Sequence, residues 1–357
     1  MKAAILRGVR DLVLQDIPVP KPRPDEVLIR VKACGICGSD IRYYLGENPW
    51  SLHTLGVQKE NPPNIALGHE VAGIIESCPE GHPVLKRGMR VGVLAFKGCG
   101  KCKYCLTDRE NLCEFTEHLG HGAGWKDREF CPGGMAEYCT VWNDKVFELP
   151  DSISFDEGVL LDGAAVALHA VKRSNIREGD KVLVNGCGPI GLMVLQMAKV
   201  YGAASVTCID VLKKPLEIAQ EVGADHVFLN QEGEVGYEKL RQMAPEGFDV
   251  IFDSVGSAES FGAVLKRLAR GGTLVCLAVK EQSIQLNCLD LAGERTITVS
   301  ANNKYEDYPE AIRLVAESAV RVQPLITHTF PLERLHEGFD VMLNKESGNA
   351  MKVVIRP

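Results

Sequence analysis

Long apolar segments are missing from this sequence of 357 residues. No run of about 18 apolar residues occurs, so the sequence predicts no membrane-spanning helix. The N-terminus also lacks an apolar stretch before its second charged residue, which argues against a secretory signal. We therefore expect a cytoplasmic protein that has no membrane partner.

An excess of positive charge is missing as well. The chain has 40 Lys and Arg against 47 Asp and Glu, which gives a formal net charge of −7. Proteins that bind nucleic acid usually present a basic surface to the phosphates, so we expect no nucleic-acid partner. There is no internal repeat and no low-complexity segment, and the length allows about two globular domains.

The pattern of apolar residues divides the chain into segments of two kinds. Residues 1–153 contain short alternating runs, such as Val27–Val31 and Glu70–Ile75, which predict a mostly β domain. Residues 154–299 contain apolar runs that alternate with helical stretches, which predicts a doubly wound parallel sheet. Residues 300–357 fit neither pattern cleanly, and we expect them to return to the first domain.

Two connections are longer than a compact domain needs, at Glu47–Ile65 and Thr116–Gly134. Long ordered loops often form lids or pocket walls, although a solvated or oligomer-contacting excursion is equally open. The loops contain His53, His118 and His121. None of these histidines has a ligand-like partner at a fixed spacing, so none is predicted to bind metal.

The cysteines are thirteen in number, and several stand at metal-like spacings, which fits a reducing compartment better than a disulfide framework. Cys99, Cys102 and Cys105 are separated by two residues each, and Cys113 follows after seven more. Four thiolates complete the tetrahedral coordination of zinc, so this spacing predicts a closed structural zinc site. Reduced bystander thiols and an iron–sulfur cluster are the alternatives. The bacterial cluster motif continues with x3-C-P, whereas here Glu114 follows the distant fourth cysteine.

A glycine-rich turn in the second domain predicts a dinucleotide site. Gly186, Gly188 and Gly191 form G-x-G-x-x-G directly after a predicted strand, with Pro189 and Ile190 inside the motif at the start of a predicted helix. The glycines allow a tight turn and a close approach of the backbone to pyrophosphate, whose charge faces the helix N-terminus. A glycine-rich turn without a ligand is the structural alternative.

Asp210 ends the next predicted strand about twenty residues later, as the dinucleotide fingerprint requires. Its carboxylate would accept hydrogen bonds from the ribose hydroxyls and would repel a 2′-phosphate. We therefore expect NAD in preference to NADP, although the neighbouring Lys213 and Lys214 leave NADP open.

Two short segments flanked by glycine supply further zinc donors. Cys37 lies in C-G-I-C-G-S-D at residues 34–40, and His69 lies in L-G-H-E at residues 67–70. Taken alone, His69 is more often a structural histidine than a ligand. Beside the four-cysteine and dinucleotide patterns, the two segments indicate a second zinc site that carries out chemistry.

The order C-G-S-D, G-H-E, C-x2-C-x2-C-x7-C, G-G-M-A-E-Y at residues 133–138, and G-x-G-x-x-G resembles the zinc-dependent medium-chain alcohol dehydrogenase family over essentially the whole chain. The likeness is greatest to the polyol and secondary-alcohol branch, which includes sorbitol, butanediol and threonine dehydrogenases. It implies an α/β fold with a GroES-like, mostly β catalytic domain from residues 1–153 and 300–357 that holds both zinc sites. It also implies a Rossmann NAD-binding domain from residues 154–299, and a homodimer or homotetramer.

The resemblance also implies roles at the second zinc site. Cys37 and His69 match the ligands of the catalytic zinc, and Glu70 matches the acid beside the metal. Asp162 is expected as the remaining protein ligand. At this position the polyol branch usually has Glu followed by Pro, whereas here Asp162 is followed by Gly163. The side chain of Asp is one methylene shorter than that of Glu.

Ser39 matches the hydroxyl that bonds the substrate oxygen and starts the proton relay, so the expected catalytic residues are Ser39, Cys37, His69 and Glu70. Arg42 stands where many members of the family have the histidine that completes this relay. Arginine stays protonated and cannot be the base. It could instead bind a phosphate or carboxylate of the cofactor or substrate, or pair with Asp40.

These assignments predict an oxidoreductase with two zinc ions per chain, acting on CH–OH donors. It would transfer a hydride between a small-molecule secondary alcohol or polyol and NAD, giving a ketone or aldehyde and NADH. One alternative is an NAD-dependent dehydrogenase of a bulkier cyclic alcohol or an acyl thioester. A more distant one is a non-catalytic nucleotide-binding protein, against which the presence of Cys37, Ser39, His69 and Glu70 argues.

Overall fold

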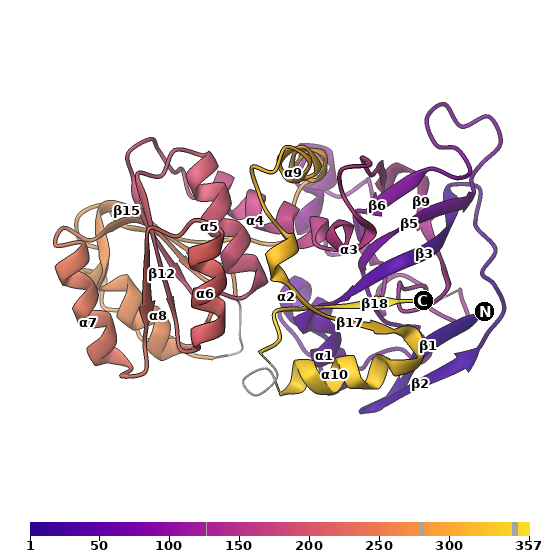
Figure 1. Cartoon of the computed structure of the whole chain (residues 1–357), viewed down its shortest axis with the longest axis horizontal. Coiled ribbons are helices and arrows are strands. Elements are labelled where there is room, and N and C mark those ends of the chain that lie inside the picture. Colours follow the sequence, from indigo (N-terminus) through magenta and orange to yellow (C-terminus); the bar gives the residue numbers. More distant parts are fainter. Residues whose placement is uncertain (126, 279–281, 345–348) are drawn as a thin grey trace. The chain divides into compact units, whose positions relative to one another are not determined.

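The computed structural model describes residues 1–125, 127–278, 282–344 and 349–357. The chain forms two compact units, each assembled from separate stretches of sequence (Figure 1). The first comprises Met1–Asp162, Lys304–Ile312 and Ile326–Pro357, and the second comprises Gly163–Asn303 and Arg313–Leu325.

The units differ in extent from the domains expected from the sequence. Residues 154–162 belong to the first unit, and residues 300–303 and 313–325 belong to the second. The domain limits at 153/154 and 299/300 stay a prediction, because a compact unit and an evolutionary domain need not end at the same residue.

A seven-stranded sheet dominates the first unit, with β3 (Glu26–Ile36) at its centre. Because β3 pairs with β5, β9 and β18, Arg30 is its one exposed position. The other strands of this sheet are β5 (Glu70–Ser77), β6 (Arg90–Val93), β9 (Tyr138–Trp142), β10 (Val146–Glu148), β17 (Ile326–Pro331) and β18 (Lys352–Arg356). Two small antiparallel sheets complete the unit, one of β1 (Lys2–Gly8), β2 (Asp11–Asp16) and β4 (Ile65–Ala66), the other of β7 (Phe96–Lys97) and β8 (Glu117–His118).

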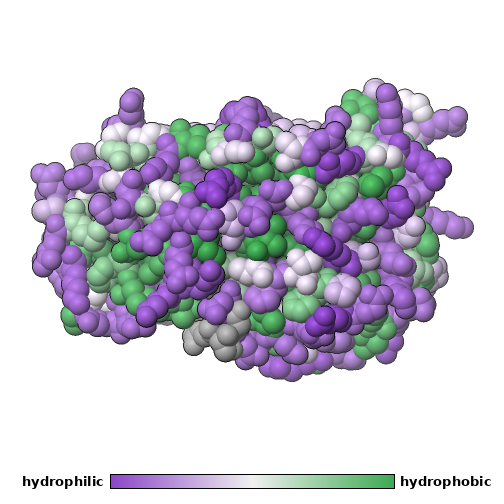
Figure 2. Space-filling view, in the orientation of Figure 1, coloured by the Kyte–Doolittle hydropathy of each residue, from purple (hydrophilic) through white to green (hydrophobic). Residues whose placement is uncertain are grey.

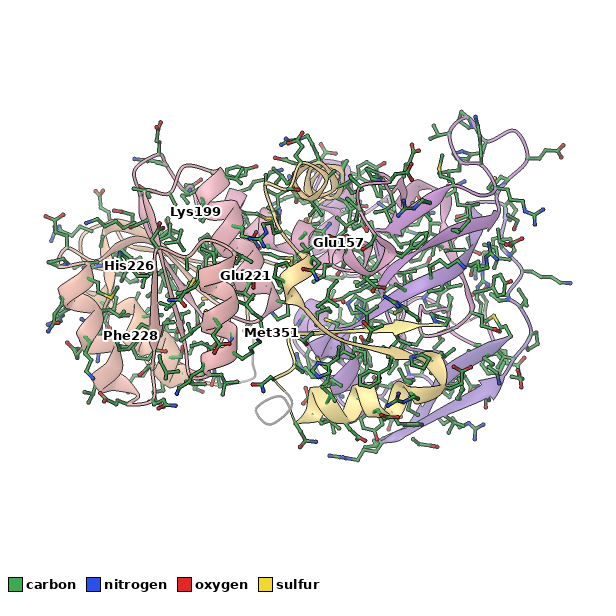
Figure 3. All side chains as sticks on the ribbon, viewed as in Figure 1. Glu157, Lys199, Glu221, His226, Phe228 and Met351 are labelled. Carbon is green, nitrogen blue, oxygen red and sulfur yellow. The ribbon has the colours of Figure 1, made fainter. Side chains whose placement is uncertain are left out.

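Short helices join these strands. In α3, Ser154 Oγ accepts from the N–H of Glu157, and the Glu157 carboxylate accepts from the N–H of Ser154 at 2.9 Å, a reciprocal cap that defines the start of the helix (Figure 3). The helices whose bounds lie wholly or partly in the first unit are α1 (Gly38–Tyr44), α2 (Pro49–Leu55), α3 (Phe155–Gly158), α4 (Leu161–Arg173), α9 (Asp307–Ala316) and α10 (Leu335–Leu343). The 3₁₀ turns among the described residues are η1 (Cys105–Thr107), η2 (Glu110–Leu112), η3 (Asn143–Lys145), η4 (Cys288–Leu291), η5 (Gln323–Leu325) and η6 (Leu332–Arg334).

The second unit is a parallel sheet of six strands in the order β13-β12-β11-β14-β15-β16. Counted from β11, this is the order 3-2-1-4-5-6 of a doubly wound dinucleotide-binding fold, so the predicted fold class is confirmed. Helices α5 and α6 pack together on one face of this sheet, and α7 and α8 pack on the other (Figure 1). The strands are β11 (Lys181–Asn185), β12 (Ser205–Asp210), β13 (His226–Leu229), β14 (Phe248–Asp253), β15 (Leu268–Cys276) and β16 (Thr296–Val299), and the helices are α5 (Pro189–Val200), α6 (Lys213–Glu221), α7 (Glu234–Met243) and α8 (Ala258–Leu265).

Each unit has its own apolar core. The strand run Val182–Val184 is completely buried, as expected for a parallel strand covered on both faces. At the edge of the same sheet, His226 of β13 is exposed, and Glu221 ends the adjacent helix α6 (Figure 3). Hydrophilic side chains cover much of the face drawn in Figure 2, with hydrophobic atoms showing between them. No helix among the described residues has both the length and the apolar character needed to cross a membrane.

Candidate metal and dinucleotide sites

The four cysteines of the predicted structural site come together in the first unit. One sulfur from each of Cys99, Cys102, Cys105 and Cys113 lies within 4.8 Å of the other three. The turns η1 and η2 fold the segment back on itself, so that the Sγ atoms of Cys102 and Cys105 are 3.6 Å apart. A backbone hydrogen bond at Lys101 lowers the pKa of the Cys99 thiol to about 6, whereas burial raises the pKa of the Cys113 thiol to about 12. The donor set therefore fits a closed zinc site.

Three strand ends of the large sheet meet at a second location. The strand β3 ends at Ile36, while β5 begins at Glu70 and β18 begins at Lys352. The antiparallel register pairs Gly35 with Glu70 and Ile36 with Val353. A Cβ at position 35 would collide with the Glu70 carboxylate, so glycine at this position leaves room for the acid.

Cys37 follows β3 directly and is the N-cap residue of α1. Its backbone N–H donates to Asp40 Oδ2 at 2.8 Å. The other carboxylate oxygen of Asp40 accepts from the N–H of Gly68 at 3.1 Å. The fully buried Asp40 therefore connects the segment of Cys37 to the segment that carries His69.

The predicted ligands of the catalytic zinc meet at this point. Cys37 Sγ, a ring nitrogen of His69 and a carboxylate oxygen of Glu70 lie within 4.8 Å of one another. Asp162, in the first turn of α4, approaches the same imidazole, with Oδ2 4.0 Å from His69 Nε2. A thiol, an imidazole and carboxylates are the donor types that zinc prefers, so the side chains fit this metal.

The electrostatics of the cluster also fit a cation. Burial alone would lower the pKa of His69, but Cys37 and Asp40 raise it well above its ordinary value. Burial raises the pKa of Asp162 to about 6. Acidic donors that are buried side by side repel one another when ionised, and a divalent cation removes this repulsion.

Glu70 also forms an ion pair with Lys352, which the sequence did not predict. Lys352 Nζ donates to both Glu70 oxygens, at 2.6 and 2.5 Å, and both side chains are buried. Burial alone would lower the pKa of Lys352, but the Glu70 carboxylate raises it. The pairing of β18 with β3 brings Lys352 and Glu70 together. The sequence around Lys352 contains no motif that predicts this ion pair.

Ser39 and Arg42 lie on α1 beside the cluster. The buried Ser39 Oγ has no hydrogen-bond partner among the described residues, so its hydroxyl can bond a ligand. The Arg42 guanidinium donates to Glu47 at 2.7 Å and contacts His53 Nε2 at 3.0 Å. The pairing of Arg42 with Asp40, one of the alternatives from the sequence, is therefore wrong, because Asp40 is buried and bonded to backbone N–H groups.

His121 also belongs to this cluster, although the sequence did not predict it there. One of its ring nitrogens lies within 4.8 Å of a ring nitrogen of His69 and a carboxylate oxygen of Asp40. Its ring packs against Tyr43, His69 and His118, with centroid distances of 4.8, 4.6 and 5.3 Å. No motif spacing could have signalled this contact, because the long loop of residues 116–134 determines it.

The glycine-rich turn has the geometry that a close phosphate approach needs. Gly186 has φ of +91°, and a Cβ at Gly191 would collide with the Gly186 carbonyl. Gly188 is the N-cap of α5, Pro189 is its first residue, and Ile190 lies in its first turn. The helix N-terminus therefore follows directly on the turn, as in a site for an anionic group.

Asp210 lies at the carboxyl end of β12 and contacts the same turn. Its Oδ2 accepts from the N–H of Cys187 at 2.7 Å, and its Oδ1 accepts from the N–H of Leu212 at 2.9 Å. These two bonds orient the carboxylate at the switch point of the sheet, where doubly wound folds bind ligands.

Comparison with known proteins agrees with this geometry. The profile of the family described as "Alcohol dehydrogenase GroES-like domain" matches residues 23–151, and the profile described as "Zinc-binding dehydrogenase" matches residues 189–317. The chain belongs to the zinc-dependent alcohol dehydrogenase family, in its polyol branch, and is thus an oxidoreductase of the class that acts on CH–OH groups. The predicted family and its GroES-like and Rossmann folds are confirmed.

Three relatives illustrate the match. The chain is 31% identical to the sorbitol dehydrogenase of Bacillus subtilis, over 100% of this chain and 97% of the relative. A putative zinc-binding dehydrogenase from Sinorhizobium meliloti, solved bound to NADP, has a TM-score of 0.89 and 29% identity, and covers 100% of this chain and 99% of its own. The 2R,3R-butanediol dehydrogenase of Bacillus subtilis has a TM-score of 0.85 and 30% identity with the same coverage.

Proposed function

We propose that this protein transfers a hydride between a secondary alcohol or polyol and NAD, giving a ketone or aldehyde and NADH. The observation that carries the proposal is the convergence of Cys37, His69 and Glu70, with Asp162 beside them, in a chain of this family. The names of the sorbitol and butanediol dehydrogenases support an alcohol with more than one hydroxyl group.

Two groups of side chains would hold zinc. Cys99, Cys102, Cys105 and Cys113 would bind the structural ion. A second group, Cys37, His69, Glu70 and Asp162, would bind the catalytic one. When bound, the catalytic zinc supplies the Lewis acidity that lowers the pKa of an alcohol, and NAD supplies the hydride acceptor.

The protein's own side chains position the substrate and move its proton. Ser39 Oγ would accept the hydrogen bond of the reacting hydroxyl and receive its proton, while its own proton would leave through a water or a ribose hydroxyl of the cofactor, because no described side chain accepts from it. Asp40 holds the Cys37 and Gly68 backbones in one arrangement, and Lys352 holds the Glu70 carboxylate. Arg42 cannot take the proton, because a guanidinium only donates and here it is bonded to Glu47.

NAD in preference to NADP rests on Asp210. A carboxylate oriented at the switch point suits the ribose hydroxyls and repels a 2′-phosphate. The relative solved with NADP and the nearby Lys213 and Lys214 argue for testing both nucleotides.

The test is turnover of purified, zinc-loaded protein, followed by NADH absorbance, over polyols, secondary alcohols, threonine and cyclic alcohols, each with NAD and with NADP. We expect turnover of polyols or secondary alcohols with NAD and its loss in Cys37→Ala. Activity confined to bulky cyclic alcohols would favour the alternative substrate class. Nucleotide binding without turnover of any substrate would contradict the proposal.

The homo-oligomer and the cytoplasmic location expected from the sequence remain predictions. Light scattering of the zinc-loaded protein tests the first, because a dimer and a tetramer differ in mass by a factor that the method resolves. Localisation of the full chain in cells tests the second.

A further inference from the structure

His121 is a buried imidazole whose polar atoms have no evident role in the fold. It is 8% exposed, and neither Nδ1 nor Nε2 has a hydrogen-bond partner among the described residues. Leaving a buried polar group without a partner costs the free energy of removing it from water. An apolar side chain would fill the same space against Tyr43 and His118 without this cost, so packing alone does not account for a histidine here.

Unpartnered ring nitrogens of His69 and His121 both lie close to Asp40. His69 Nδ1 is also buried and has no hydrogen-bond partner in the described chain, and it lies 3.9 Å from Asp40 Oδ1. A ring nitrogen of His121 lies within 4.8 Å of the same pair of residues. Nε2, at the other edge of the ring, is the atom nearest to Asp162. Asp40 therefore approaches His69 at its Nδ1 edge, opposite to Asp162, and His121 lies beside the pair formed by His69 and Asp40.

The separations suit one bridging water molecule. A distance of 3.9 Å is too long for a direct hydrogen bond between His69 and Asp40. A water that makes two hydrogen bonds of about 2.8 Å joins atoms about 3.9 Å apart at an angle of about 90° and atoms about 4.6 Å apart at a tetrahedral angle. Asp40, His69 and His121 offer such a molecule three polar partners, the usual number for a buried water.

We propose that His121 is a positioning residue for the metal site, which orients His69 by sharing a bridging water with its Nδ1 edge and with Asp40. The inference rests on the proposed function, because it assumes that His69 Nε2 binds the catalytic zinc. A ligating histidine is commonly oriented by a hydrogen bond at its second nitrogen. Here that bond would need both Asp40 and His121, since the carboxylate alone lies too far away.

The experiment measures zinc release from the full chain into excess chelator, in the unsubstituted protein and in His121→Leu, His121→Asn and His118→Leu. Cys37→Ala identifies which kinetic phase belongs to the catalytic site. We expect His121→Leu to speed this phase by about 10–100-fold. His121→Asn should recover part of the slow release, because its amide keeps a donor and an acceptor. In the cobalt-substituted protein, His121→Leu should shift the visible absorption band of this site, while release from the four-cysteine site stays unchanged.

His118→Leu is the matched control. His118 is also an imidazole stacked on His121, but its nitrogens are not part of the cluster around His69. We expect its catalytic-site release rate to equal that of the unsubstituted protein. If His121→Leu does not fold, as judged by circular dichroism, His121→Phe replaces it, because a planar ring still packs against Tyr43 and His118.

Three outcomes would overturn the inference. Release from His121→Leu at the unsubstituted rate would show that His121 does not position His69. An additional metal ion per chain that disappears in His121→Leu would show that Asp40, His69 and His121 hold a cation in place of water. Equal zinc content in Cys37→Ala and the unsubstituted protein would remove the proposed catalytic site itself, which distinguishes failure of the proposed function from failure of this inference.

Discussion

Lys352 Nζ lies 2.6 and 2.5 Å from the two carboxylate oxygens of Glu70, although 282 residues separate them in sequence. The side chains of Lys352 and Glu70 are 6% and 5% exposed. A buried carboxylate needs a compensating charge, and in this pair the lysine supplies it before any metal binds.

Lys352→Met should destabilise the zinc-free protein by about 3–5 kcal/mol, because it leaves the Glu70 carboxylate buried without a partner. The measurement is the free energy of unfolding in urea. Arg313→Met is the control, since it breaks an exposed ion pair with Glu317, and such pairs contribute about 0–1 kcal/mol. Equal losses in the two variants would show that the Glu70 carboxylate does not depend on Lys352.

Cys105→Ser should remove one zinc ion per chain, because a hydroxyl is a poorer zinc ligand than a thiolate and the other three cysteines cannot close the tetrahedron. Metal content after dialysis measures the effect. Cys78→Ser is the matched control, because Cys78 lies outside both clusters and its Sγ contacts the Leu85 carbonyl at 3.5 Å. Full zinc content in Cys105→Ser would argue against four-cysteine coordination.

Asp210→Asn should reduce the preference for NAD over NADP on the order of tenfold, the factor that corresponds to about 1.4 kcal/mol. The amide keeps the shape of the side chain but removes the charge that repels a 2′-phosphate. The ratio of kcat/KM for the two nucleotides measures the change. Glu217→Gln removes one exposed negative charge from the following helix and should leave the ratio unchanged. A ratio that does not move in Asp210→Asn would show that another group selects the nucleotide.

The buried carboxyl group of Asp253 should make the free energy of unfolding of the second unit depend on pH. Burial raises its pKa above 3.8, although Asn185 Nδ2 donates to Oδ1 at 2.7 Å. A raised carboxyl pKa in the folded state means that this group's stabilisation is full below pH 3.8 and is lost as the pH rises through the folded pKa.

In Asp253→Asn, the free energy of unfolding should therefore not include this loss of stabilisation as the pH rises. The measurement is the difference in free energy of unfolding between the unsubstituted and variant proteins, followed upward from about pH 4. We expect the difference to turn against the unsubstituted protein as the pH rises. Asp151→Asn, at an exposed carboxylate, controls for the loss of one charge. A difference that stays constant over this range would contradict the prediction.

The contacts that could be expected from the sequence are those between residues whose positions along the chain already imply proximity. The glycine-rich turn and Asp210 stand at the ends of neighbouring parallel strands, so their order along the chain already implies their proximity. The four cysteines fall within one segment of residues 99–113, whose short turns bring the sulfurs together. Local spacing is sufficient for such features, because few backbone conformations join the residues.

Only the tertiary structure determines which residues surround Cys37, His69 and Glu70. Lys352 meets Glu70 because β18 and β5 flank the same strand, and strand pairing of this kind depends on the whole core of the first unit. His121 reaches His69 through a long loop whose path no periodic pattern specifies. Asp40 does not pair with Arg42, because its carboxylate accepts hydrogen bonds from the buried N–H groups of Cys37 and Gly68. These N–H groups need an acceptor only when the fold buries them. Residue types and spacing thus define which donors are present, while sheet register and burial determine which of them meet.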